Sequence, residues 1–185
     1  MRRIFFTCCV ILFAYVFLPS VSSAKDATIA DVLVTNNTEN VLLYARLVNC
    51  FTKEMDAAIL AGVPTTFTVI VDLYRERSYW WDDKVSRKLI KHTVRYDIVK
   101  KTFYVSSTEG EAATFQDFES AKRAMADING IVVAPLKNIR KNETFYIMLK
   151  AELDKVRLPL HMENVLFFVS LWDFKTDWYR QKFVY

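Results

Sequence analysis

Residues 64–81, PTTFTVIVDLYRERSYWW, carry the clearest strand pattern in the chain. Apolar side chains recur at every second position, which is the period of a β-strand with one buried face. The residues that share this apolar face are Phe67, Val69, Val71 and Leu73. The alternation weakens from Arg75 to Arg77. We therefore predict one strand over residues 64–81 whose inner face belongs to the hydrophobic core.

Two further strand patterns follow this segment. Asp82 and Asp83 predict a turn, and residues 88–98 then alternate again, with His92 on the same face as Ile90. Residues 101–107 are predicted to form the neighbouring strand. A parallel crossover needs a dozen or more residues between strands, so these short connections predict an antiparallel meander.

The remaining segments divide between strands and short helices. Further strands are predicted over residues 27–35 and 41–49, which form a hairpin, and over 131–136, 144–153 and 172–179. A helix over residues 53–61 has Thr52 as its cap and Gly62 as its stop. A helix over 114–129 has Thr114 and Asp117 as a capping pair and Gly130 as its stop, and a third short helix is predicted around 163–171.

Seven or eight strands with two or three short helices define the expected fold class. We predict a mainly β domain in which two antiparallel sheets pack face to face as in a sandwich, with helices at edges or ends. An α+β domain with one large antiparallel sheet is the alternative. The hydrophobic content of 52% suits a chain that buries a core, and three glycines and four prolines in 185 residues exclude collagen-like and glycine-rich architectures.

The first 24 residues have the layout of a secretory signal peptide. Arg2 and Arg3 precede an apolar run from Ile4 to Leu18, and small residues lead to Ala24. We predict cleavage after Ala24, a single domain over residues 25–185 and an exported protein in the periplasm or cell envelope. The alternative is an uncleaved N-terminal membrane anchor, although this run is shorter than the ~20 apolar residues of a spanning helix. No later segment of the sequence is long and apolar enough to span a membrane.

Charge and cysteine content narrow the partner classes. Without Arg2 and Arg3 the chain has 23 basic and 21 acidic residues, which leaves a net charge of +2. This near-neutral balance predicts no nucleic-acid partner. Cys50 is the single cysteine after residue 24, so no internal disulfide can form, and its apolar neighbours predict a small buried side chain.

The sequence offers no recognisable catalytic set, and we predict no cofactor. His92 and His161 are the two histidines, no pair of ligands has zinc-site spacing, and no metal site is expected. His92 is interpreted as a structural histidine. Ser170, His161 and Asp173 supply the residue types of a nucleophilic triad, but sequence order alone carries no geometry. Asp82 with Asp83, and Asp173 with Asp177, are the paired carboxylates that a hydrolase could use.

Paired aromatic residues are the remaining candidates for function. Trp80 precedes Trp81, and Trp178 precedes Tyr179, within segments predicted as strands. Neighbouring side chains on a strand point to opposite faces, so one ring of each pair should point outward. An outward Trp or Tyr offers a large contact area to a partner, whereas coverage by a helix or by the second sheet is the structural alternative.

Four short segments resemble those of a known family. They are Gly62-Val63-Pro64, Asp72-Leu73-Tyr74, Arg95-Tyr96-Asp97 and the closing Trp172-Asp173-Phe174-Lys175-Thr176-Asp177-Trp178-Tyr179. In these segments the chain resembles the bacterial exported proteins grouped as domain-of-unknown-function family 4390. The resemblance implies a bacterial origin and an envelope location, and it transfers no catalytic residue, activity or cofactor.

These observations together favour a non-enzymatic protein-binding or assembly module in the bacterial envelope. Its expected partner is another envelope protein, with Trp80, Trp81, Trp178 and Tyr179 as contact candidates. Two alternatives stay open at this point: a cell-envelope hydrolase that uses paired carboxylates, and a carrier of a small apolar ligand with a cavity between the sheets.

Overall fold

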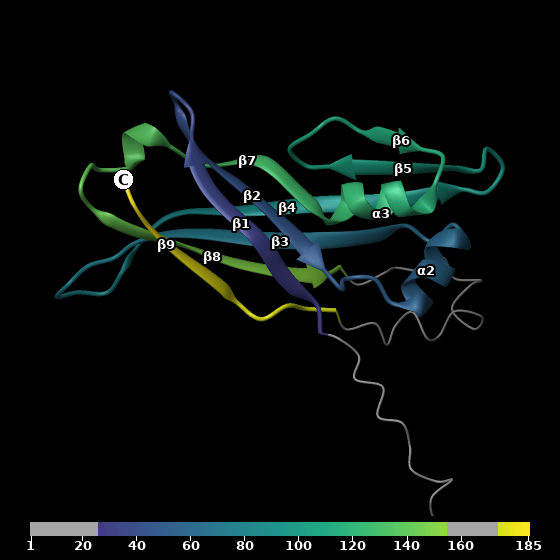
Figure 1. Ribbon diagram of the computed structural model, residues 1–185, viewed down its shortest axis with the longest axis horizontal. Coiled ribbons are helices and arrows are strands. Elements are labelled where there is room, and N and C mark those ends of the chain that lie inside the picture. The colour runs from purple at the N-terminus through teal and green to yellow at the C-terminus, as the bar shows by residue number, and fades with distance from the viewer. Residues whose placement is uncertain (1–25, 155–173) are drawn as a thin grey trace, which may run out of the picture.

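The computed structural model describes residues 26–154 and 174–185, and these form two antiparallel β-sheets (Figure 1). The smaller sheet has the order β1 (Thr28–Asn36), β2 (Asn40–Val48) and β7 (Asp127–Pro135). The larger sheet has the order β6 (Ala113–Phe115), β5 (Thr102–Ser107), β4 (Asp83–Asp97), β3 (Thr65–Arg75), β8 (Thr144–Leu153) and β9 (Tyr179–Val184). The predicted mainly β fold with two antiparallel sheets is confirmed, and the single-sheet alternative is not adopted.

Alternation along β3 and β8 places the core between the two sheets. The inward residues of β3 are paired with inward residues of β8, as Val71 is with Leu149. The small sheet contributes inward residues from β2 and β7. The buried set on these four strands includes Phe67, Val69, Val71, Leu73, Phe145, Ile147, Leu149, Ala151, Val41, Leu43, Leu47, Ile128, Ile131 and Val133. Removal of this apolar surface from water is the main force that holds the layers together.

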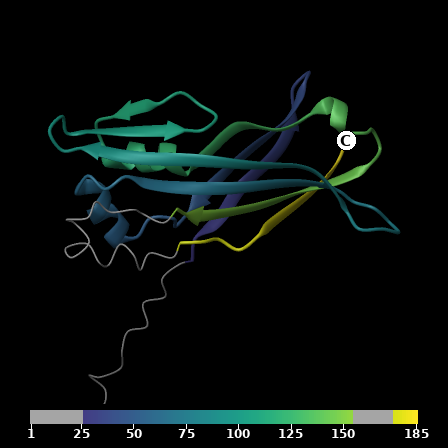
Figure 2. The same ribbon diagram turned by 180° about the vertical axis from the view of Figure 1, so that it is seen from behind.

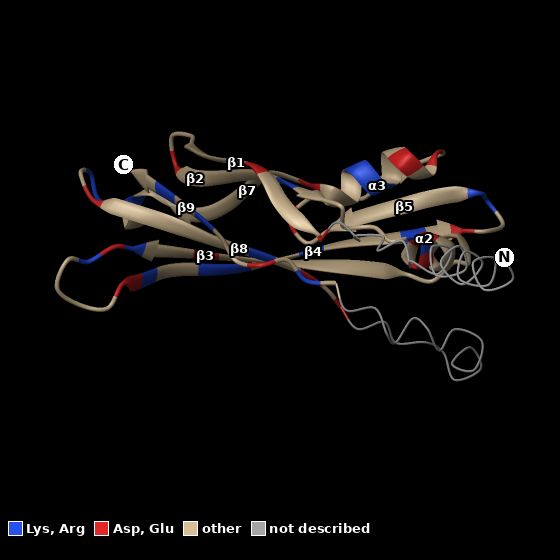
Figure 3. Ribbon diagram, turned by 60° about the horizontal axis from the view of Figure 1, so that its bottom comes forward, with Lys and Arg blue, Asp and Glu red and all other residues tan. Residues whose placement is uncertain are grey.

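The strands of the two sheets cross at an oblique angle. Strands β1 and β2 run diagonally over β3 and β4, and the edge strands of the larger sheet curl toward the smaller sheet (Figures 1 and 3). At one edge the sheets are joined by a hydrogen bond in which Ser86 Oγ donates to the carbonyl of Val133 at 2.9 Å. The view from behind shows the same arrangement (Figure 2). The smaller sheet therefore covers the inner, concave face of the larger sheet. The outer face carries the other half of the side chains, those at alternate positions along each strand.

The helix α2 (Lys53–Leu60) forms where the sequence predicts it. Thr52 Oγ1 accepts a hydrogen bond from the Met55 N–H at 3.2 Å, as a helix cap does. The helix ends before Gly62, whose φ of +85° is costly for residues with a side chain. Lys122 then ties α2 to α3 (Phe118–Ala126), because its Nζ lies 3.1 Å from a carboxylate oxygen of Asp56.

The helix predicted over residues 114–129 is shorter than expected. Thr114 lies in β6, where it is paired with Tyr104, and the helix begins at Phe118 with Asp117 alone as its cap. At the other end, residues 127–129 belong to β7, because Ile128 is paired with Ala45 and is needed in the core between the sheets. Gly130 does not stop the helix; it lies within β7 at a φ of +67°, packed against the Tyr44 hydroxyl.

The strand predicted over residues 64–81 ends early, and the next one begins early. β3 stops at Arg75, and β4 starts at Asp83 rather than Lys88. The two strands form one hairpin, and Arg75 is the last residue of β3 that is paired with β4, opposite Asp83. Residues 76–82 form the connecting loop, so the prediction that Trp80 and Trp81 lie on a strand was wrong.

The last strand also differs from its prediction. Residues 172–179 were predicted as the final strand, but β9 runs from Tyr179 to Val184. Just before it, Thr176 already pairs with β8: its N–H donates to the Ala151 carbonyl at 2.8 Å, and its Oγ1 accepts from the Ala151 N–H at 3.0 Å. Side-chain capture of this backbone N–H replaces a regular ladder bond. The helix predicted around residues 163–171 lies outside the described residues.

We expect Gly62→Ala to destabilise the protein by about 1–2 kcal/mol, because an alanine in the left-handed region is strained. The added Cβ would also lie only 3.2 Å from Ile98 Cδ1. Gly110→Ala is the matched control, since its Cβ would meet Ser107 at an ordinary 3.6 Å. Urea unfolding of both variants measures the difference, and equal stabilities would contradict this account of the helix end.

Candidate functional site

Trp80 and Trp81 lie in the loop that joins β3 to β4, and this loop projects beyond one end of the two sheets (Figures 1 and 2). Their side chains are 78% and 92% exposed, and the preceding Tyr79 is 92% exposed. We call Tyr79, Trp80 and Trp81 the aromatic tip. Sequence reasoning found the two tryptophans but not Tyr79, although Tyr79 belongs to the same uninterrupted aromatic run.

Asp82 closes the loop behind the aromatic tip. One of its carboxylate oxygens accepts the Arg77 N–H at 3.0 Å, and the other accepts the Tyr146 hydroxyl at 2.8 Å. The hydrogen bond from the Arg77 backbone lowers the pKa of Asp82. Burial, followed by the bond to Asp82, raises the pKa of Tyr146 to about 12. The acceptor therefore stays ionised and the donor stays protonated at neutral pH, and the loop is tied to the neighbouring strand β8.

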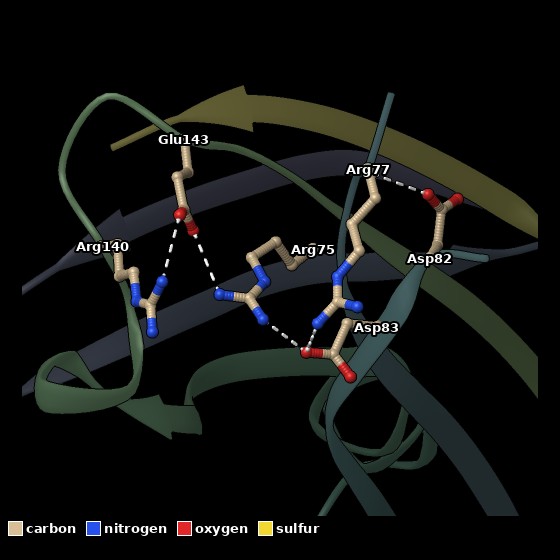
Figure 4. A network of polar contacts seen from close by, with 6 residues as sticks. All are labelled: Arg75, Arg77, Asp82, Asp83, Arg140 and Glu143. Atoms are coloured by element: carbon tan, nitrogen blue, oxygen red, sulfur yellow. Dashed lines mark hydrogen bonds and ion pairs between the residues drawn. The ribbon is translucent and has the colours of Figure 1, made fainter. Parts of the chain in front are cut away.

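A network of ion pairs braces the base of the hairpin (Figure 4). Asp83 Oδ2 lies 2.6 Å from Arg75 Nη2 and 2.9 Å from Arg77 Nη2. Glu143, on the loop before β8, lies 3.4 Å from Arg75 and 3.7 Å from Arg140. The hydrogen bond from Arg75 is the largest cause of the lowered pKa of Asp83. Alternating guanidinium and carboxylate groups thus connect the hairpin to the loop beside it.

An open cleft of about 710 Å³ lies next to this network. Its lining consists of polar and charged residues: Arg75, Glu76, Arg77, Ser78, Arg140, Asn142, Glu143 and Thr144. A general acid needs a pKa near the working pH, whereas the pKa of Asp83 at its margin is lowered. The lining also contains no histidine or cysteine to activate a hydroxyl. The ion pairs that Arg75 and Arg140 form with Glu143 at this lining brace the hairpin against the loop before β8.

Trp178 lies on a different surface, the outer face of the larger sheet. Leu89 is paired with Ile70, and Ile70 with Lys150, so these three side chains share one face across β4, β3 and β8. Lys150 Nζ lies 5.9 Å from the centroid of the Trp178 ring, which extends this row to the start of β9. Leu89 is 53% exposed and Trp178 is 45% exposed. We call Ile70, Leu89, Lys150 and Trp178 the outer-face patch.

Tyr179 points the other way. It packs against the core, and its hydroxyl donates to Gln181 Oε1 at 3.1 Å. The pair Trp178 and Tyr179 therefore has one outward and one inward ring, as the alternation predicts, while both rings of Trp80 and Trp81 are exposed. Five residues, about 17 Å at the rise of a strand, separate Ile70 from the end of β3 at Arg75, so the patch and the aromatic tip are separate surfaces.

Two rows of stacked and charged side chains hold the strands next to the outer-face patch. In one row Lys84, Tyr74, Tyr146 and Arg180 stack in sequence, with the Tyr74 and Tyr146 rings 5.1 Å apart and Arg180 3.8 Å from the Tyr146 ring. In the other, Asp72 accepts hydrogen bonds from Arg87 at 2.7 Å and Lys84 at 3.2 Å. Figure 3 marks the positions of basic and acidic residues along the strands in blue and red. The patch is thus presented on a rigid surface.

The structure also places the other candidates of the sequence analysis. Cys50 is buried, and burial raises the pKa of its thiol to about 12, so it is an inert core side chain. His92 is buried, with Nδ1 2.9 Å from the Met125 carbonyl, as expected of a structural histidine. Asp177 is exposed, whereas Asp173, His161 and Ser170 lie outside the described residues. Within residues 26–154 and 174–185, no cluster of His, Cys, Asp or Glu could hold a metal ion.

Fold and site define a β-sandwich domain with two separate aromatic surfaces. Within the described part of the chain, no helix is long and apolar enough to cross a bilayer. The chain belongs to the family described as a domain of unknown function, DUF4390, whose family model matches residues 24–182. This match confirms the resemblance found in the sequence. Comparisons with curated proteins and with solved structures gave no significant match.

We expect Asp72→Asn to destabilise the protein by about 1–3 kcal/mol at neutral pH, because the side chain is 3% exposed and its charged hydrogen bonds are lost. Burial raises the pKa of Asp72, but the bonds from Arg87 and Lys84 outweigh burial and leave the pKa lowered. The stability from this carboxylate is therefore present above the ordinary value of about 4 and is lost as pH falls through the lowered pKa.

Urea unfolding of wild type and variant between neutral pH and pH ~2 tests this dependence. The difference in unfolding free energy should narrow below pH ~4 as Asp72 is protonated in the wild type. Asp177→Asn, at an exposed position, is the control and should change stability little at any pH. A difference for Asp72→Asn that stays constant with pH would show that packing, not charge, sets its effect.

Proposed function

We propose that this protein is a non-enzymatic domain of the bacterial envelope that binds another protein through its outer-face patch. The observation that carries the proposal is the row of Leu89, Ile70 and Lys150 across β4, β3 and β8, which Trp178 extends just before β9. The proposal has two parts, export to the envelope and protein binding, and each has its own test.

Export is supported by the N-terminal sequence and by the family. Two arginines, an apolar run and a small residue at position 24 have the order of a signal peptide. The match to DUF4390 begins at residue 24, next to the expected cleavage site. On this basis the working form of the protein begins at Lys25 and acts in the periplasm or cell envelope.

Protein binding is supported by the composition and the rigidity of the patch. Hot spots of protein interfaces are enriched in Trp, Tyr and Arg, and they combine an apolar anchor with a charged surround. Trp178 and Leu89 supply apolar contact area, while Arg180 and Arg87 lie in the two adjoining rows, on Tyr146 and on Asp72. The stacked tyrosines and the buried Asp72 fix this surface before a partner arrives, which reduces the entropy lost on binding.

The alternative functions have weaker support from the described residues. A hydrolase would need a carboxyl with a raised pKa, whereas the pKa values of Asp82 and Asp83 are lowered. A carrier of an apolar ligand would need an apolar cavity between the sheets, whereas the cleft beside Arg75 is polar and opens at one end of the molecule. Binding through the patch therefore remains the function that the geometry supports best.

We expect the double variant Leu89→Ala, Trp178→Ala to lose a specific protein partner. Crosslinking in intact cells, affinity capture and mass spectrometry should recover one envelope protein with the wild type and not with this variant. The removed side chains are about half exposed, so the variant should keep its fold. Leu33→Ala, at a 58% exposed position on β1, is the matched control and should still capture the partner. Equal capture by a folded double variant would refute the assignment.

The N-terminal sequence of the protein recovered from cell fractions tests export. We expect the chain in the periplasmic or envelope fraction to begin at Lys25, because Ser22 and Ala24 suit the signal peptidase site. An Ala24→Arg variant should be retained with its N-terminal segment, because the enzyme requires a small residue before the cut. Wild-type protein found uncleaved in the cytoplasm would contradict an envelope function, and uncleaved protein in the membrane would indicate an anchor.

A further inference from the structure

The aromatic tip has a composition and a position that the outer-face patch does not share. Three consecutive large aromatic side chains are almost fully exposed at the end of a hairpin. Scattered exposed apolar residues need no explanation, but a contiguous group at the farthest point of a projecting loop does. Because these rings lie outside the core, folding does not account for their presence.

We propose that the aromatic tip inserts into the interfacial region of a lipid bilayer. Trp and Tyr are the residues that gather at the boundary between headgroups and acyl chains, because each has an apolar body and one polar hydrogen-bonding group. Tyr79, Trp80 and Trp81 supply three such rings in sequence, with no charge from Ser78 to Trp81. The insertion requires no complementary pocket, which suits a narrow projecting loop better than the broad contact of a protein interface does.

The charges behind the tip favour shallow insertion. Arg77 and Asp82 lie on either side of the uncharged segment. The Arg77 N–H donates to the Asp82 carboxylate and closes the loop just behind the rings. Arg140 and Lys141 lie on the loop beside the hairpin base, where both are exposed. Cations at this height can contact lipid phosphates while their stems cover apolar surface. The rings therefore enter the interface, and the ion-paired base stays in the headgroup region.

Rigidity of the hairpin base makes this contact more favourable. Asp83 binds two arginines and Asp82 binds both the Arg77 backbone and Tyr146, so the direction of the loop is fixed before it meets a surface. Ordering of a flexible loop on binding would cost conformational entropy. The inference is independent of protein binding, because the outer-face patch shares no residue with the tip, and its nearest β3 residue, Ile70, lies five residues before the end of that strand.

Fluorescence quenching by brominated lipids tests the insertion directly. In the full chain, Trp172→Phe and Trp178→Phe leave Trp80 and Trp81 as the only tryptophans. Vesicles of phosphatidylcholine with a minority of phosphatidylglycerol carry bromine near either the headgroup end or the methyl end of the acyl chain. We expect stronger quenching from the position near the headgroup. Unquenched Trp80 and Trp81 overturn the proposal, including the case in which the chain sediments with vesicles through its N-terminal segment.

Vesicle affinity provides the second measurement. We expect Trp80→Ser, Trp81→Ser to weaken binding about tenfold or more, with urea unfolding unchanged because both side chains are exposed. The control is Val99→Ser, an equally exposed apolar residue on the turn between β4 and β5 at the other end of β4, which should leave affinity unchanged. Equal affinity of tip and control variants overturns the proposal. So does loss of a protein partner from the tip variant when its vesicle affinity is unchanged.

Discussion

The pairing of β3 with β4 on one side and β8 on the other is the constraint on which the structure depends. Each partner places its inward residues beside Phe67, Val69, Val71 and Leu73, so one strand organises the buried face of the larger sheet. A shift of one residue in either register would turn the inward side chains of the shifted strand, β4 or β8, to the outer face. The small sheet packs over the apolar surface that β3 and β8 share, to which β4 adds the buried Ile90.

The same register also decides what the outer face presents. Because the inward positions are fixed, Ile70, Asp72 and Tyr74 must point away from the core, and their cross-strand neighbours follow. The outer-face patch and the row of stacked tyrosines are therefore consequences of core pairing rather than independent features. Asp72 shows what this requires of an acidic residue. It lies on β3, between β4 and β8, and Arg87 and Lys84 of β4 neutralise its charge.

Sequence periodicity predicted the parts of the fold in which one face is buried. β8 matches its predicted residues 144–153, and α2 follows its cap and its glycine stop, because these signals are local. The predictions were wrong where pairing with a strand distant in the sequence determines the structure. Thr114 pairs with β5 rather than capping α3, and residues 127–129 join β7 because Ile128 completes the core. Alternation predicted one exposed ring in each aromatic pair. It could not place Trp80 and Trp81 in a loop, because the hairpin ends where Arg75 pairs with Asp83.

The hydrogen bonds that close the β3–β4 loop do not depend on the side chains at its tip. Asp82 accepts these bonds from the Arg77 backbone and from the Tyr146 hydroxyl, all outside residues 78–81. The bonds therefore place no requirement on which side chains occupy positions 78–81. Evolution or an engineer could therefore exchange those residues, or graft a different peptide between the same two anchors, while the scaffold stays intact.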